Sequence, residues 1–153
     1  MTYNTIIFTV HEPPFAKQRP RFSSQGGWFR SYTPAKTHRA EKLIRRAFDE
    51  QCKGVKIPLN GPISVTIKFL MPIPGSLSKK KKEALKLSPH VKRPDIDNLM
   101  KTVCDALNNY VFSDDSQIYL LTATKAYTDG EPRTLVEIVS LGEDYDNTTT
   151  SNS

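Results

Sequence analysis

The strongest pattern in the sequence lies in Arg93-Pro94-Asp95-Ile96-Asp97-Asn98-Leu99-Met100-Lys101. It places two carboxylates two residues apart at the predicted start of a helix, with a lysine four residues after the second. A further acidic pair, Asp114 and Asp115, follows just past the predicted end of that helix. Magnesium prefers carboxylate oxygens, and a lysine beside it can meet the negative charge of a phosphate. The pattern therefore indicates a site that holds a divalent cation against a phosphate group.

Helical periodicity extends from Asp97 to Tyr110 and supports this placement. Asp97 and Lys101 are one turn apart, so a helix brings their side chains to the same side. Asp95 and Asp97 can share one ion if the backbone bends where the helix starts. The alternative is that the aspartates serve only as a helix cap and an acidic turn, which are common roles for Asp. The apolar face of this helix is predicted to consist of Leu99, Val103, Ala106, Leu107 and Tyr110.

Several stretches have the alternation or the apolar density of β-strands. The clearest alternation runs from Ile63 to Met71, where every second residue is apolar, and Pro72 ends it. The stretch 117–127 is apolar on both faces in its first half, which favours a central strand. The other predicted strands are 3–11, 134–141 and a short return strand near 28–32.

Helices alternate irregularly with these strands. Thr33 and Pro34 suit the N-cap and first turn of a helix that Gly54 ends, and a short helix is predicted over 79–87. A regular order of strand, helix and parallel strand is missing from this pattern, so the prediction is an α+β fold. We expect one domain over residues 1–141, with a mixed β-sheet of about four to five strands packed with two main helices.

The net charge of the last twelve residues differs in sign from that of the rest of the chain. The formal net charge is +6, and residues 142–153 hold three acids and no base, so residues 1–141 carry +9. A strongly basic body suits a polyanionic partner such as nucleic acid. Residues 142–153 are polar and are predicted to form a disordered tail.

The two cysteines suggest neither a disulfide nor a zinc site. Cys52 and Cys104 are far apart and lack metal-ligand spacing, so both are predicted to be ordinary buried thiols in helices. Met1–Val10 alternates and does not form the apolar run of a signal peptide. No apolar run approaches the roughly 18 residues that span a bilayer. We therefore expect a cytoplasmic protein without membrane contact.

A basic segment near the start of the chain is the second candidate functional feature. Lys17-Gln18-Arg19-Pro20-Arg21 precedes a glycine turn and the aromatic stretch Trp28-Phe29-Arg30. Cations can meet phosphates while aromatic rings stack on unpaired bases. The alternative is an ordinary hairpin whose aromatic side chains pack on the core. We predict DNA contacts by Lys17, Arg19, Arg21, Arg30, Lys92 and Arg93.

The acidic stretches resemble a known family of nucleases, the RusA-type Holliday junction resolvases. Lys17–Arg21 is also similar to the basic motif near the N-terminus of many members, and the resemblance covers most of residues 3–141. It implies a homodimeric, magnesium-dependent endodeoxyribonuclease of bacteria and their phages that cuts four-way DNA junctions by paired nicks. The most specific segments of the resemblance are Asp95-Ile96-Asp97-Asn98-Leu99, Lys101, Asp105-Ala106-Leu107 and Asp114-Asp115-Ser116-Gln117.

The same resemblance implies roles for individual residues. Asp95, Asp97 and Asp115 would hold magnesium, with manganese as a substitute, and Lys101 would be the catalytic lysine. The residues alone leave open whether Asp114 or Asp115 is the third ligand. Two other functions are also open: a nuclease of the same chemistry that acts on flaps or replication forks, and a noncatalytic basic DNA-binding protein.

Overall fold

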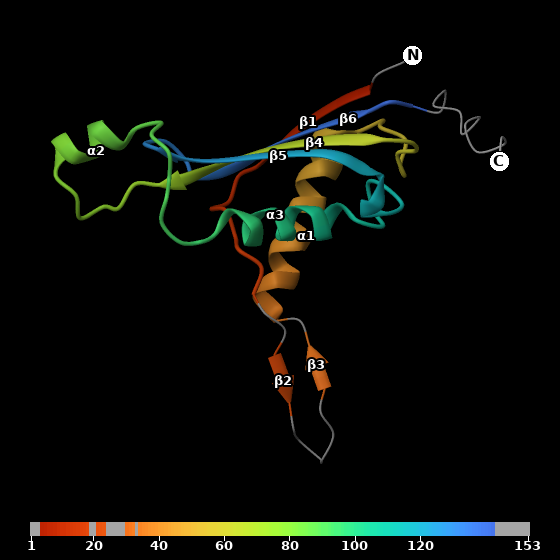
Figure 1. Cartoon of the computed structure of the whole chain (residues 1–153), viewed down its shortest axis with the longest axis horizontal. Helices are drawn as coiled ribbons and strands as arrows, with labels where there is room; N and C mark the ends of the chain where they lie inside the picture. The colour runs from red at the N-terminus through yellow and green to blue at the C-terminus, as the bar shows by residue number, and fades with distance from the viewer. Residues whose placement is uncertain (1–3, 19–20, 24–29, 33, 143–153) are drawn as a thin grey trace.

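The chain folds into a four-stranded mixed sheet with helices packed on one face (Figure 1). The computed structural model describes residues 4–18, 21–23, 30–32 and 34–142. This architecture confirms the predicted α+β fold. The elements in chain order are β1 (Asn4–Val10), β2 (Arg21–Ser23), β3 (Arg30–Tyr32), α1 (Ala35–Gln51), β4 (Ile63–Pro72), α2 (Lys79–Leu85), α3 (Ile96–Leu107), the 3-10 helix η2 (Asp115–Gln117), β5 (Ile118–Thr128) and β6 (Arg133–Ser140).

β4 lies inside the main sheet, whereas β5 lies at one edge. The strand order is β1-β6-β4-β5, with β4 antiparallel to β6 and parallel to β5. The prediction of a central strand at 117–127 was wrong, because β5 has β4 as its one neighbouring strand in this sheet. Its apolar first half is exposed to solvent, with Tyr119 at 61%, Leu120 at 53% and Leu121 at 39%. An apolar pattern on both faces of this strand does not reflect burial within one chain.

The hydrophobic core lies between the sheet and the helices α1 and α3. The inward-facing residues of β4 are at most 4% exposed, as their period-two pattern predicted. Burying each large apolar side chain stabilises the fold by about 1.5–3 kcal/mol, and this holds α3 against the sheet. α3 ends at Leu107, two residues before Asn109, the predicted helix end. The residues concerned are Ile63, Val65, Ile67, Phe69 and Met71 in β4, and Leu99, Val103, Ala106 and Leu107 in α3.

The basic segment leads into a small two-stranded sheet. β2 and β3 pair antiparallel and project beyond the N-terminal end of α1, away from the main sheet (Figure 1). The sequence predicted the return strand but not its partner β2. The side chains of 19–33 lie outside the described residues, and with them the DNA contacts predicted for Arg19, Arg21 and Arg30. The predicted cap residue Thr33 lies outside as well, and Pro34 occupies the N-cap of α1.

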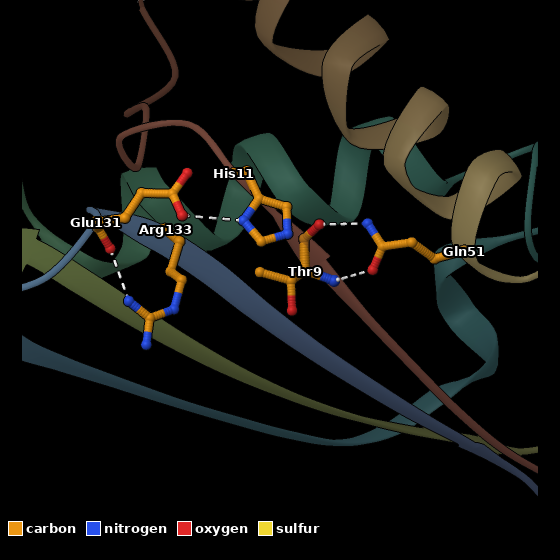
Figure 2. Close-up of polar contacts among 5 residues, drawn as sticks. All are labelled: Thr9, His11, Gln51, Glu131 and Arg133. Carbon is orange, nitrogen blue, oxygen red and sulfur yellow. Dashed lines mark hydrogen bonds and ion pairs between the residues drawn. The ribbon is translucent and has the colours of Figure 1, made fainter.

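The outer edge of β1 is closed near its end by α1 (Figure 2). Gln51, the last residue of α1, accepts a hydrogen bond from the Thr9 amide at 2.8 Å and donates one to the Thr9 carbonyl at 2.6 Å. Beside it, His11 Nδ1 lies 3.2 Å from Glu131 Oε2, and Arg133 donates to the Glu131 carbonyl. The Gln51 amide thus takes the place of a neighbouring strand at this point.

The outer edge of β5 is covered along only half of its length. Its C-terminal half meets the segment 87–90, which exchanges backbone hydrogen bonds of 3.0 Å with Lys125 and Tyr127. Along 118–124, the outer edge has no backbone partner among the described residues. The open half of the β5 edge is therefore the part that carries the exposed apolar side chains.

The remaining predictions about the chain have separate outcomes. The disordered tail predicted at 142–153 lies outside the described residues from position 143 onward. Within the part of the chain that is described, no helix combines the length and apolar character needed to cross a membrane. Cys52 and Cys104 are free thiols and only partly shielded from solvent, so the prediction that they are buried was too strong.

Candidate active site

Both aspartates of the predicted Asp-x-Asp pair lie at the start of α3. Asp95 is the N-cap residue, with an extended backbone (φ −69°, ψ 142°), and Asp97 lies in the first turn. The Asp95 side chain makes no capping hydrogen bond within the described residues, while its backbone carbonyl accepts the Leu99 amide at 3.2 Å. Both carboxylates are on exposed residues. Capping is therefore not the task of the Asp95 carboxylate, and both acids are open to a ligand.

A cavity of about 770 Å³ lies between β5 and the loop that enters α3. Asp95 and Asp97 line it, together with Lys92 and Arg93 of the loop and Lys125 of β5. Lys92 and Arg93, two of the predicted DNA contacts, are exposed here. This first cavity combines acids that suit a hard cation with bases that suit phosphate.

Asp97 also lines a second cavity, of about 460 Å³, with Lys101, Asp105 and Asp115. The Lys101 ammonium lies 4.0 Å from Asp97 Oδ2, and the two side chains are 62% and 61% exposed. An exposed ion pair of this kind contributes at most about 1 kcal/mol to stability. Neither side chain is therefore committed to holding the fold together. The rest of the cavity wall includes Met100, Cys104, Ile118, Tyr119, Leu120 and Leu121.

The two aspartates of the acidic turn have different surroundings. The Asp114 amide donates to Gln117 Oε1 at 3.0 Å, and the Asp114 carboxylate accepts a hydrogen bond from the Ser116 hydroxyl. That hydroxyl is the main cause that lowers the pKa of Asp114. Asp115, by contrast, lines the second cavity with Asp97. Of the two acids, Asp115 is the better placed to share a ligand with Asp97.

The acids line an open surface and do not form a closed metal cage. Among the described residues, no three His, Cys, Asp or Glu side chains gather closely enough to hold an ion by themselves. Magnesium commonly keeps several waters and takes one or two carboxylates together with substrate phosphates. Asp97, with Asp95 in one cavity and Asp115 in the other, offers a donor set of that kind. Burial above all, and then Asp105 and Asp115, raises the pKa of the nearby Cys104 thiol to about 11.

The basic segment is attached to α3 through its first lysine. The Lys17 amide donates to the Asn98 carbonyl at 3.0 Å, and the Lys17 ammonium pairs with the Asp105 carboxylate. The two charged side chains are 33% and 35% exposed. The chain that enters β2 therefore starts beside the second cavity. A DNA contact by Lys17 has to compete with this ion pair.

Comparison with known proteins identifies the family of the chain. Residues 12–139 match the family model described as endodeoxyribonuclease RusA. The chain belongs to the RusA family. It is also 38% identical over 138 residues to the uncharacterized protein YqaN of Bacillus subtilis (strain 168), across 87% of this chain and 94% of that protein. The resemblance predicted from the acidic motif is confirmed, and RusA membership indicates an endodeoxyribonuclease.

Lys125 lines the first cavity of the candidate site, and the sequence analysis did not single it out. It is the only charged residue in β5. That isolated charge is the sequence feature that could have marked Lys125 as a functional residue. Its ammonium reaches the loop before Asp95, and the carbonyls that it meets there are brought near by tertiary structure alone. His90 lines the same cavity, and burial first, then the charge of Lys125, lowers its pKa. The first cavity thus has a fixed positive charge on its β5 wall.

Proposed function

We propose that this RusA-family protein is a magnesium-dependent endonuclease that resolves four-way DNA junctions by paired nicking. The observation that carries the proposal is the position of Asp97, which lines one cavity with Asp95 and the basic loop and the other with Lys101 and Asp115. Acidic residues suited to a metal ion and basic residues suited to phosphate therefore both lie near the Asp97 side chain. Membership of the RusA family supports DNA as the substrate.

Each residue has a proposed role in phosphodiester hydrolysis. Asp95, Asp97 and Asp115 would hold magnesium together with water and the substrate phosphate, with manganese as a substitute. When bound, the ion supplies charge neutralisation, an activated water and help for the leaving oxygen. The Lys101 ammonium meets the charge that develops on the phosphate in the transition state. Its exposure allows it to reach a DNA strand without breaking a buried contact.

Cleavage assays on matched synthetic substrates test this function. A four-way junction, a flap, a fork and a linear duplex of equal length are incubated with magnesium, with manganese and with EDTA. We expect symmetric nicks in the junction with either metal, and none in EDTA. Equal cleavage of flaps or forks would favour the broader nuclease, and tight junction binding without cleavage in any metal would identify a noncatalytic DNA-binding protein.

Removing Lys92 and Arg93 together is expected to reduce the salt dependence of junction binding. Each lost phosphate contact lowers the slope of log affinity against log salt by about 1, so the double alanine variant should lose about 1–2 units. Gel-shift titrations in EDTA measure the slope. The matched control is Lys53→Ala with Lys56→Ala, since these exposed lysines line neither cavity. An unchanged slope for the first pair, or an equal loss in the control, would contradict this assignment.

We further propose that two copies associate through the open half of the β5 edge. Residues 118–124 are uncharged and expose Tyr119, Leu120 and Leu121 along an edge without a backbone partner in the described chain. Such an edge is an aggregation hazard in a single chain, whereas antiparallel pairing about a two-fold axis satisfies both copies. The same apolar residues line the second cavity with Lys101, so the dimer would bring two active sites near its axis. Paired nicking needs two sites that act within one bound lifetime.

A further inference from the structure

Lys125 holds the loop that leads into the candidate metal site. Its ammonium donates to the Lys92 carbonyl at 2.6 Å and to the Pro94 carbonyl at 2.7 Å. Its own backbone carbonyl accepts the His90 amide at 3.0 Å. Lys125 is the one hydrogen-bond partner that the backbone of residues 91–94 has within the described chain. The position of this loop therefore depends on a single side chain.

The strand that carries Lys125 is a firm base for these contacts. In the parallel register of β4 and β5, Lys125 lies opposite Phe69, which is 1% exposed. The loop is open to solvent by comparison, with Val91 at 86% exposure. Pro94 directly precedes Asp95, the N-cap of α3. Because the peptide unit between them is planar, a fixed Pro94 carbonyl fixes where the Asp95 nitrogen and Cα lie, and so the point from which the Asp95 side chain starts.

We infer that Lys125 is a positioning residue for the proposed metal site and holds Asp95 where it can share an ion with Asp97. This inference rests on the proposed function, which assigns a metal to these two acids. Lys125 acts through two backbone carbonyls, and its ammonium forms no ion pair among the described residues. A positive charge beside a cation site by itself weakens metal binding. Positioning and charge therefore have opposite effects on metal affinity, and this makes the role of Lys125 measurable.

The decisive variant is Lys125→Met, which keeps much of the length of the side chain but removes both the charge and the donors. Manganese binding to the free protein is followed by electron paramagnetic resonance, with no DNA present. The loss of an outer-shell partner is expected to weaken binding by about 10–100-fold. The loss of charge alone would tighten it. The matched control is Lys68→Met, which removes the same charge from an exposed position on the other face of the sheet and should leave manganese affinity unchanged.

Junction cleavage adds a readout that separates positioning from direct contact with the substrate. In Lys125→Met the rate should recover toward the wild-type rate as magnesium is raised, because the defect lies in holding the ion. A lysine that touched the reacting phosphate would instead lower the rate at saturating magnesium. Lys125→Arg keeps the charge and the donors and should rescue most of the manganese binding.

Unchanged or tighter manganese binding in Lys125→Met would overturn the inference, as would a cleavage defect that saturating magnesium does not relieve. If Lys125→Met does not melt cooperatively, Lys125→Ala carries the same comparison, because it also removes the charge and the donors. A wild-type protein that binds manganese but leaves every junction intact would count against the proposed function. The manganese comparison between wild type and Lys125→Met would still decide the role of Lys125.

Discussion

Asp97→Asn should nearly abolish junction cleavage and leave the protein folded. Asn keeps the shape of the side chain but loses the charge that a hard cation prefers, so nicking is expected to slow by roughly 10³-fold, or about 4 kcal/mol in the transition state. The fold should change little, because Asp97 is 61% exposed and an acid in the first helical turn contributes at most about 1 kcal/mol. Junction binding should hold or tighten, since a negative charge facing phosphate is gone.

The measurement pairs nicking rates in magnesium with gel-shift affinity and thermal melting. Asp114→Asn is the matched control, because the Asp114 carboxylate is bonded to the Ser116 hydroxyl within its own turn, and its variant should cut at nearly the wild-type rate. Asp115→Asn and Lys101→Ala should lose cleavage as Asp97→Asn does. Wild-type nicking by a well-folded Asp97→Asn protein would mean that Asp97 is not an essential ligand.

The double change Leu120→Lys with Leu121→Lys should convert the proposed dimer into monomers. The side chains of the two leucines point to opposite faces of β5, so the change places unpaired charges on both sides of the proposed contact. Burying such charges costs several kcal/mol, which raises the dissociation constant by at least roughly 100-fold. The single chain should still fold, because these side chains are 53% and 39% exposed within it.

Sedimentation at micromolar concentration measures this change in assembly. Ile7→Lys is the matched control, because Ile7 is 63% exposed on β1, at the opposite edge of the sheet, and its variant should stay dimeric. A double variant that still sediments as a dimer would reject the β5 edge as the contact. A wild-type protein that is monomeric at this concentration and still cuts junctions would reject the dimer itself.

Local patterns in the sequence predicted the elements of the fold well. The alternation of β4 and the apolar stripe of α3 depend only on the geometry of a strand and of a helix, so neighbouring residues reveal them. β5 was wrongly predicted to be a central strand, because two different situations give the same sequence pattern of apolar side chains on both faces of a strand. They can be buried between layers of one chain, or they can be left at an edge, as Tyr119 and Leu120 are here.

The candidate site was predictable only in part. The acids of α3 and of the acidic turn lie close in sequence, and their spacing was enough to suggest a shared task. The Lys125 contact to the Pro94 carbonyl and the Lys17 pair with Asp105 join distant parts of the chain, so no local pattern announces them. The different surroundings of Asp114 and Asp115 also appear only once the hydrogen bonds of the turn are known.

The two hydrogen bonds between Gln51 and Thr9 affect how many copies of the protein can associate through the edges of the sheet. A sheet with two free edges can add copies without end and grow into a fibre. Here one edge strand, β1, is met at Thr9 by its own helix, while β5 is open along 118–124. Two copies joined through β5 would present only their β1 strands at the outside. Gln51 at Thr9 and the Cys52 thiol at the Ile7 carbonyl occupy part of that edge, so further pairing through β1 would have to displace them and association through the sheet would favour two copies.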